Sequence, residues 1–557
     1  MSDTPTGGDA IVRVLKQAGV DTVFGVISVA NFAIYDALSR QGGFHVVASR
    51  GEAGAVNAAD AYARASGRLG VAITSTGPGV GNAGGALMEA QVAGTPLLHI
   101  TGQVESEALD KGRGAGHEMK GQFEMLRAVS KAAFRPISAA ATPWSVHAAA
   151  EQALAPPRGV ASVEVPVDYQ RGPVAPVALP PLAEAARRAP APEAVRRAAE
   201  ILASARRPVV WYGSGVIAAE AAPEARALAE ALGAPVLTSQ AGRGVLPEDH
   251  PLCLGNFLSS PPVQELVQGA DVLLAVGTRL RGIETNNWQT PLPPTIVQVD
   301  ADPLGIGRGY PVAAAVVGDA KLALAALRAA LPPDAGPDPA FAEAAAAARA
   351  AARAAVRATL GPYEQVLDDL LAVLPRDAIR VRDVTVHAGI WGNRIWEVYE
   401  PRTSIHAVGA GIGQGLAMAI GAKIARPERA VVLLVGDGGF MVNLGELATA
   451  VQEQVGIVIV VFNDRGYGIL RNVQERAWGG RHLAVDLHTP DFTRLAADFG
   501  AWSQRVSAAG AFRGALEAAL DARGPALLEL DMTAIGPTAV PYTGPAGASA
   551  ALLAGRS

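Results

Sequence analysis

The sequence predicts an α/β fold of three doubly wound domains, each built on a parallel sheet. The first observation is that short apolar runs rich in valine, isoleucine and leucine alternate along the chain with alanine-rich segments of helical period. These runs lack the polar alternation of a half-exposed strand, which indicates strands buried on both faces of a parallel sheet. The second observation is the length, because 557 residues correspond to about three domains of ordinary size.

The composition excludes several classes of protein. Half of the residues are hydrophobic and 18% are charged, so we expect large buried cores. A formal net charge of −5 argues against a nucleic-acid-binding surface or a polybasic membrane anchor. The single cysteine, Cys253, excludes an internal disulfide, and we expect it to be a small buried apolar residue. Because the sequence shows neither a secretory signal nor an apolar run of membrane-spanning length, we expect a soluble, cytoplasmic protein.

The first domain is predicted over residues 1–171. Its helices are expected at 10–18 and in the alanine-rich segment 53–65, and the turn STGPGVGN would open another helix near Asn82. Its strands are expected at 22–26, 45–48, 71–74, 96–101 and 161–165. A segment rich in proline and alanine, 172–192, is expected to link this domain to the next.

The second domain is predicted over residues 193–332, with strands at 208–212, 235–238, 272–276 and 296–299. Gly213 and Gly215 follow the first of these strands, but the full GxGxxG fingerprint of a dinucleotide site is absent. A purely structural domain is therefore favoured over one that binds a dinucleotide. The next segment, 333–360, contains an alanine-rich stretch at 340–355 that we interpret as a solvated connecting helix.

The third domain, predicted over residues 361–535, contains two strands that each end next to an aspartate. A strand at 430–435 leads into a GDGG turn with Asp437, and after a helix a second strand at 457–462 ends just before Asp464. In such a βαβ unit the carboxyl ends of both strands lie at one sheet edge, so the two aspartates should lie close together. Carboxylates beside a helix N-terminus suit a Mg²⁺ ion that carries a diphosphate, and glycines let the backbone approach phosphate oxygens.

Two features of this domain stay open at this point. GDGG can instead be only a tight turn, and Asp464 only a strand-end cap. The tail, 536–557, is rich in glycine and proline and is either disordered or folded over a site.

These features resemble the signature of thiamine diphosphate-dependent enzymes, and the chain is similar over nearly its whole length to the acetolactate synthase and 2-oxo acid decarboxylase group. Besides GDG, the resemblance is carried by FGVISVANFAIYDAL, SRGEAGAVNAADAYARASG, LGAPVLTSQAGRGVLPEDHPL and ADVLLAVGTRL. It implies a pyrimidine-binding first domain, a central domain and a diphosphate-binding third domain, with thiamine diphosphate and Mg²⁺ as cofactors. Asp437, Asp464 and the carbonyl of Gly466 would be the metal ligands. The family usually has asparagine where Asp464 stands, and Arg465 would offset part of the added charge.

The resemblance also implies roles for residues around the cofactor. Glu52 would hydrogen-bond to the pyrimidine ring and favour the imino tautomer that removes the thiazolium proton. Ile412, followed by Gly413, would wedge between the two cofactor rings. The other cofactor contacts would be Gly436, Gly438, Gly439 and Tyr467, and the groups beside the substrate would be His117, Glu118 and His387. The alternatives are structural: a helix-dipole contact for Glu52, core packing for Ile412 and ordinary hydrogen bonds for the histidines.

The family implies cleavage or formation of a carbon–carbon bond next to the carbonyl of a 2-oxo acid. We expect acetolactate synthase-like carboligation first, then decarboxylation of a 2-oxo acid other than pyruvate, then cleavage of a 2-hydroxyacyl-CoA. The paired histidines of simple pyruvate decarboxylases are absent, because Glu118 follows His117. FAD binding by the central domain stays open, as do two other classes, a non-catalytic cofactor-binding relative and a flavin- or nicotinamide-dependent oxidoreductase. Since the family takes the glutamate from one subunit and the diphosphate site from another, we expect a homodimer or homotetramer.

Overall fold

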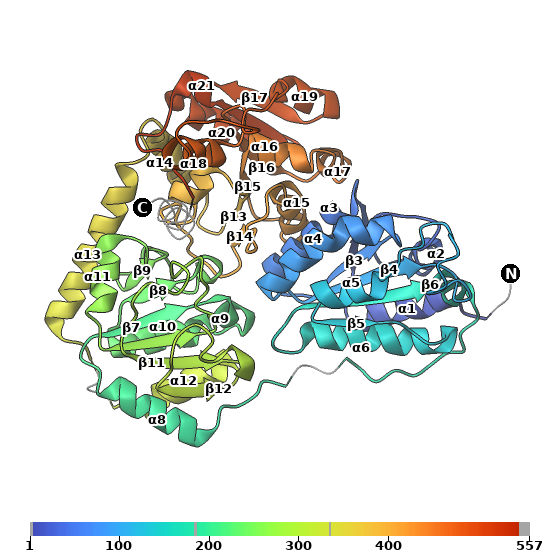
Figure 1. Cartoon of the computed structure of the whole chain (residues 1–557), viewed down its shortest axis with the longest axis horizontal. Helices are drawn as coiled ribbons and strands as arrows, with labels where there is room; N and C mark the ends of the chain where they lie inside the picture. The colour runs from blue at the N-terminus through green and yellow to red at the C-terminus, as the bar shows by residue number, and fades with distance from the viewer. Residues whose placement is uncertain (1–3, 183–185, 333–335, 545–557) are drawn as a thin grey trace.

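Three parallel sheets of six strands each organise the chain, and the predicted three-domain α/β fold is confirmed (Figure 1). The computed structural model describes residues 4–182, 186–332 and 336–544. Parts of both predicted linkers (183–185 and 333–335) and of the tail (545–557) lie outside the described residues. Among the helices that are described, none is long and apolar enough to cross a membrane.

The N-terminal sheet has the strand order β2-β1-β3-β4-β6-β5, and all its pairs are parallel. The strands predicted from apolar runs are present, whereas the short edge strand β5 was not predicted, because three half-buried residues give no periodic signal. The strands are β1 (Thr22–Gly25), β2 (His45–Ala48), β3 (Gly70–Thr74), β4 (Leu97–Gln103), β5 (Ala132–Phe134) and β6 (Val160–Pro166). The helices are α1 (Gly7–Gln17), α2 (Phe32–Gln41), α3 (Glu52–Ser66), α4 (Pro78–Ala93), α5 (Gln122–Val129), α6 (Thr142–Leu154) and α7 (Val167–Arg171).

The central sheet has the order β12-β11-β10-β7-β8-β9 and is also parallel. Its outer strands β9 and β12 were not predicted, and Cys253 is buried in β9, as expected of a small apolar residue. The strands are β7 (Pro208–Tyr212), β8 (Val236–Thr238), β9 (Cys253–Gly255), β10 (Val272–Val276), β11 (Thr295–Asp300) and β12 (Ala314–Val317). The helices are α8 (Pro192–Ala203), α9 (Ser214–Ala218), α10 (Ala222–Leu232), α11 (Pro261–Gln268) and α12 (Ala320–Ala330).

The predicted connecting helix is α13 (Pro339–Arg357), but the expectation that it is solvated was wrong. Figure 1 shows α13 running beside α11 toward the third domain. One face of α13 is buried in the core shared by the central and third domains: Phe341, Ala345, Ala348, Ala352 and Val356. Alanine occupies most of this buried face and much of the exposed face as well. The sequence therefore indicated a helix but gave no clear amphipathic pattern.

The C-terminal sheet has the order β14-β13-β15-β16-β18-β17, again with parallel pairs. The GDGG segment is not a turn, because Gly436 caps α16 and the next residues form its first turn. The strands are β13 (Ile379–Arg382), β14 (Ser404–His406), β15 (Val431–Gly436), β16 (Ile457–Asn463), β17 (Trp502–Val506) and β18 (Ala526–Asp531). The helices are α14 (Tyr363–Val373), α15 (Gly415–Ala425), α16 (Asp437–Val442), α17 (Glu446–Gln452), α18 (Gly468–Ala477), α19 (Phe492–Phe499), α20 (Phe512–Asp521) and α21 (Met532–Ile535).

Within one chain the first and third domains are joined by helix packing. Helix α3 lies against α15, and a Cβ placed on Gly421 would come within 1.9 Å of the carbonyl oxygen of Ala58 (Figure 1). Only glycine permits this approach of the two backbones. The carboxylate of Glu446 in α17 accepts hydrogen bonds from the N–H groups of Arg50 and Gly51, each 3.0 Å long, just before α3 begins.

The described part of the C-terminal tail folds back onto the third domain. The carbonyl oxygen of Tyr542 accepts a 3.0 Å hydrogen bond from Asn472 Nδ2 in α18. The ring of Tyr542 lies against Gly389, where an added Cβ would come within 2.2 Å of the ring. Up to residue 544, therefore, the tail is a packed segment of this domain.

Candidate cofactor site

The two strand-end aspartates lie together at the carboxyl edge of the C-terminal sheet. Asp437 begins α16 directly after β15, and Asp464 follows β16, the strand paired with β15. The N–H of Gly466 donates a 2.8 Å hydrogen bond to Asp437 Oδ2. The structure thus brings Asp437, Asp464 and the backbone of Gly466 together at one sheet edge.

The charges of these carboxylates are poorly compensated by the protein. Burial, and then the neighbouring charge of Asp464, raise the pKa of Asp437 to about 7. Burial also raises the pKa of Asp464, although Arg471, with Nη1 3.6 Å from Asp464 Oδ2, opposes that effect. The predicted partner Arg465 is exposed, so Arg471 is the cation beside this carboxylate. A buried and a partly buried carboxylate that repel each other fit a divalent cation, whose charge would compensate both.

The glycines around Asp437 are required by protein neighbours. A Cβ on Gly438 would lie 2.6 Å from the ring of Tyr467, which places Tyr467 against the first turn of α16. A Cβ on Gly439 would lie 3.2 Å from Asp383 Oδ1, and one on Gly436 would lie 3.3 Å from the hydroxyl of Thr385. From the sequence we explained these glycines by their contact with phosphate alone. At Gly438, close packing against Tyr467 is by itself a sufficient reason for a glycine.

Asp383, which the sequence analysis missed, organises the segment that contains Ile412. It follows β13, and its carboxylate accepts hydrogen bonds from the N–H groups of Gly413 (3.0 Å) and Gly415 (2.7 Å). Gly413 has a φ of +85°, and its carbonyl accepts a 2.6 Å hydrogen bond from Asn443 Nδ2. Ile412 is 39% exposed beside this anchored glycine. The sequence did contain a signal for Asp383: like Asp437 and Asp464, it is an aspartate that directly follows a strand of the parallel sheet.

Glu52 is the first residue of α3 and is only 8% exposed. Asn82 Nδ2 in α4 donates a 3.1 Å hydrogen bond to Glu52 Oε2. Gly79, also in the first turns of α4, lies so close that an added Cβ would be 2.8 Å from Glu52 Oε1. Burial and the charge of Glu52 together raise the pKa of Tyr35. Glu52 is therefore a buried carboxylate held in one orientation, as a catalytic carboxylate requires.

The predicted substrate residues His117 and Glu118 lie in the loop before α5. The half-buried Glu118 accepts hydrogen bonds at its carboxylate from the N–H groups of Gly112, Gly114 and Ala115, at 2.8–3.0 Å. These backbone hydrogen bonds, that of Ala115 first, lower the pKa of Glu118. Glu118 therefore holds its own loop together. His117 is exposed with a φ of +63°, and its carbonyl oxygen would contact a Cβ on Gly77, next to α4.

The structure places His387 in an aromatic core, which differs from the predicted position facing the cofactor. Its ring is fully buried between the rings of Tyr363 and Phe462, each with a centroid distance of 4.1 Å. Trp391 Nε1 donates a 3.1 Å hydrogen bond to His387 Nδ1. Burial lowers the pKa of His387 to about 3, so the imidazole is neutral at physiological pH.

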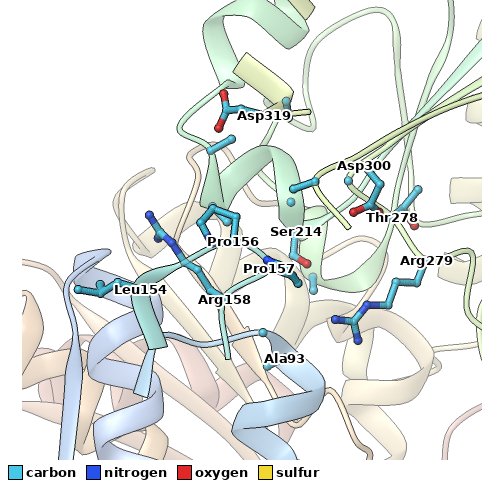
Figure 2. A pocket seen from close by; sticks show the side chains of 18 of the residues that line it. Ala93, Leu154, Pro156, Pro157, Arg158, Ser214, Thr278, Arg279, Asp300 and Asp319 are labelled. Carbon is cyan, nitrogen blue, oxygen red and sulfur yellow. The ribbon is translucent and has the colours of Figure 1, made fainter. Parts of the chain in front are cut away.

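A cavity large enough for a ligand lies between the N-terminal and central domains, away from the carboxylate pair. It is a cavity of about 1010 Å³, and Figure 2 shows Arg158 on one side and Ser214, Thr278, Arg279 and Asp300 on the other. Gly215, noted in the sequence, packs against Gly277 at the edge of this cavity, where an added Cβ would be 2.7 Å from the Gly277 Cα. A cavity of this size with charged groups from two domains has the dimensions of a nucleotide-binding pocket.

Three protein-family models match successive parts of the chain. They are the thiamine pyrophosphate enzyme N-terminal TPP binding domain (residues 5–130), central domain (195–327) and C-terminal TPP binding domain (383–530). Among solved structures, the chain resembles one described as a "putative thiamin diphosphate-dependent enzyme" from Mycobacterium smegmatis, with a TM-score of 0.80 and 26% identity. The similarity covers 95% of this chain and 99% of that one.

Two relatives illustrate the range of activities among similar sequences. A probable 2-ketoarginine decarboxylase of Pseudomonas aeruginosa is 37% identical over 511 residues, which is 89% of each chain. A probable acetolactate synthase large subunit of Methanocaldococcus jannaschii is 30% identical over 546 residues, covering 94% of this chain and 91% of the relative.

Proposed function

Since the chain belongs to the thiamine pyrophosphate enzyme family, we propose that it removes carbon dioxide from a 2-oxo acid other than pyruvate and releases the aldehyde. The family's carboligases and decarboxylases share the carbon dioxide-releasing half of the reaction and differ in the second half, which adds either a proton or another carbonyl compound. The similarity to a decarboxylase, at 37% identity, is the observation that favours the aldehyde. Similarity to acetolactate synthases over nearly the whole chain makes carboligation the second candidate.

The residues of the site have distinct parts in this proposal. Asp437, Asp464 and the carbonyl of Gly466 would hold Mg²⁺ and, through it, the diphosphate. When bound, thiamine diphosphate supplies a nucleophilic carbon for the 2-oxo carbonyl and an electron sink as carbon dioxide leaves. Glu52 would hold a proton at the pyrimidine ring, with Asn82 keeping its carboxylate in place.

We also propose that the active form is a homodimer in which each site combines Glu52 of one subunit with Asp437 of the other. Large apolar side chains are exposed on both domains that contain these two residues. They are Ile27, Val29 and Phe32 in the first domain and Ile412, Met441 and Val442 in the third. Exposed apolar clusters of this kind support a contact with a second copy.

The cavity between the first and central domains supports a bound nucleotide, with FAD and a CoA nucleotide as the two candidates. Arg158 and Arg279 offer cations for phosphate groups, and Asp300 ends β11 as a hydrogen-bond acceptor for a ribose. A flavin absorption spectrum of the purified protein would identify FAD, and ADP binding by calorimetry would identify the nucleotide class. Failure of both measurements would refute a nucleotide in this cavity.

Product analysis by proton NMR tests the reaction. The protein would be incubated with thiamine diphosphate, Mg²⁺ and one 2-oxo acid at a time: pyruvate, branched, aromatic and guanidino-substituted. We expect the aldehyde of a non-pyruvate acid. Acetolactate from pyruvate would assign the protein to the carboligases instead, and consumption of none of the acids would refute both assignments.

A further inference from the structure

The segment 407–413, which we name the wedge loop, contains Ile412 and is held by residues of all three domains. At its C-terminal end, Asp383 and Asn443 bind the N–H and the carbonyl of Gly413, and both belong to the third domain. At its N-terminal end, the N–H groups bind a residue of the first domain, more than 300 residues earlier in the chain. Arg281 Nη1 of the central domain donates a 3.0 Å hydrogen bond to the carbonyl oxygen of Val408. The third domain alone therefore does not determine where Ile412 lies.

The first-domain partner is Glu89 in α4, whose carboxylate is fully buried. One carboxylate oxygen accepts a hydrogen bond from the N–H of Val408, and Oε2 accepts one of 2.7 Å from the N–H of Gly409. A Cβ on Gly409 would lie only 2.7 Å from Glu89 Oε2, so the backbone of the loop lies directly on the carboxylate. Bidentate binding of adjacent N–H groups by one buried carboxylate restricts both the position and the orientation of the loop.

Arg64 in α3 completes the contact. Its Nη2 lies 3.2 Å from Glu89 Oε1 and 2.5 Å from Asp60 Oδ2, and its Nη1 donates a 2.7 Å hydrogen bond to the carbonyl oxygen of His406. The guanidinium thus orients Glu89 and binds the residue immediately before the wedge loop. The planar guanidinium has several N–H donors in fixed directions, so it can bind Glu89 and the carbonyl oxygen of His406 at the same time. A lysine ammonium cannot make both contacts in the same geometry.

We propose that Glu89 and Arg64 are positioning residues for the cofactor: they set the place of Ile412 through the backbone of the wedge loop. The inference rests on the proposed function, because it takes Ile412 as the residue beneath the cofactor rings. Neither residue touches the carboxylate pair that would hold the metal and diphosphate. The positioning effect should therefore appear in the binding of the cofactor rings and leave the binding of diphosphate unchanged.

Glu89→Gln is the sharpest test, because it keeps the size of the side chain but replaces one acceptor oxygen by an NH₂ group. That group cannot accept a hydrogen bond from the wedge loop and would face another donor. The matched control is Glu248→Gln. Glu248 is also buried, pairs with Arg243 at 2.6 Å and accepts a 2.9 Å hydrogen bond from the N–H of Val398, outside the wedge loop.

Binding would be measured by tryptophan fluorescence during titration with thiamine diphosphate at saturating Mg²⁺, and separately with inorganic diphosphate. We expect both variants to melt at lower temperature than the wild type. Glu89→Gln alone should weaken thiamine diphosphate binding, by about 10-fold for the loss of a charge-assisted hydrogen bond. Its affinity for inorganic diphosphate should equal that of the wild type.

Three results would overturn the proposal. Glu89→Gln could bind thiamine diphosphate as tightly as the wild type, Glu248→Gln could weaken it equally, or inorganic diphosphate could be weakened by the same factor. If Glu89→Gln does not fold, Glu89→Asp and Arg64→Lys keep the charges and should weaken cofactor binding in the same direction but less. A wild-type protein that binds no thiamine diphosphate would instead refute the proposed function, so the two failures are distinguishable.

Discussion

Replacing Gly413 by alanine should distort the wedge loop. The free-energy cost of the substitution has two contributions that the structure identifies. The positive φ of +85° disfavours any residue with a Cβ, by about 1–2 kcal/mol. The new methyl would also lie 2.4 Å from the Cβ of Val442, and such overpacking costs about 1–3 kcal/mol. Together they amount to about 2–5 kcal/mol, which is large enough for the loop to move rather than accept the contact.

The assay is hydrogen–deuterium exchange of peptides covering residues 407–418, together with titration by thiamine diphosphate. Gly413→Ala should accelerate exchange there and weaken cofactor binding. Gly500→Ala is the matched control, since Gly500 has a φ of +89° but an added Cβ would have only Val451 nearby, at 3.6 Å. The control should show the smaller, purely conformational cost and normal cofactor binding. Equal effects of the two substitutions, or unchanged exchange in Gly413→Ala, would refute the reasoning.

Three further outcomes are expected. Glu52→Gln should still bind thiamine diphosphate but lose at least about 100-fold in turnover, because the carboxylate that acts on the pyrimidine is gone; wild-type turnover would contradict its role. Co-expressed Glu52→Gln and Asp437→Asn subunits should regain about a quarter of wild-type activity if each site is shared between subunits, because half of the dimers then carry one intact site. A site built within one chain would regain none. In Asp9, burial is outweighed by hydrogen bonds led by that of Arg40, which lower the pKa of the carboxyl. Ionised Asp9 thus stabilises the folded protein fully above about pH 4, and this contribution shrinks as the pH falls toward the lowered folded-state pKa. Asp9→Asn should therefore reduce the melting temperature more at neutral pH than at about pH 2, as calorimetry would show.

Much of the fold followed from local patterns in the sequence. Buried parallel strands need continuous apolar runs, and these runs located most strands of the first two sheets and the central pair β15 and β16 of the third. The missed strands of the first two sheets, β5, β9 and β12, are short and lie at sheet edges. In the third sheet β13, β14, β17 and β18 were not predicted either. Short edge segments become strands because a neighbouring strand offers hydrogen bonds, which a local pattern does not encode.

The candidate site was predicted to the extent that topology alone brings residues together. Asp437 and Asp464 could be paired in advance, since parallel strands place their carboxyl ends at one edge. His387 could not be placed, because its burial between Tyr363 and Phe462 depends on how α14 packs against β16. The role of Glu118 in holding its own loop likewise depended on the course of the backbone from 112 to 115.

The sequence by itself determined the three-domain α/β architecture, the carboxylate pair at the edge of the third sheet and the resemblance that identified Glu52. Only the tertiary structure decided which side chains hold these groups in place. Glu89 and the N–H of Val408 are 319 positions apart and meet only because α3 packs against α15 of the third domain and α4 packs against α3. Periodicity and motifs report what a residue's near neighbours in the chain require, whereas contacts between domains depend on the packing of whole surfaces.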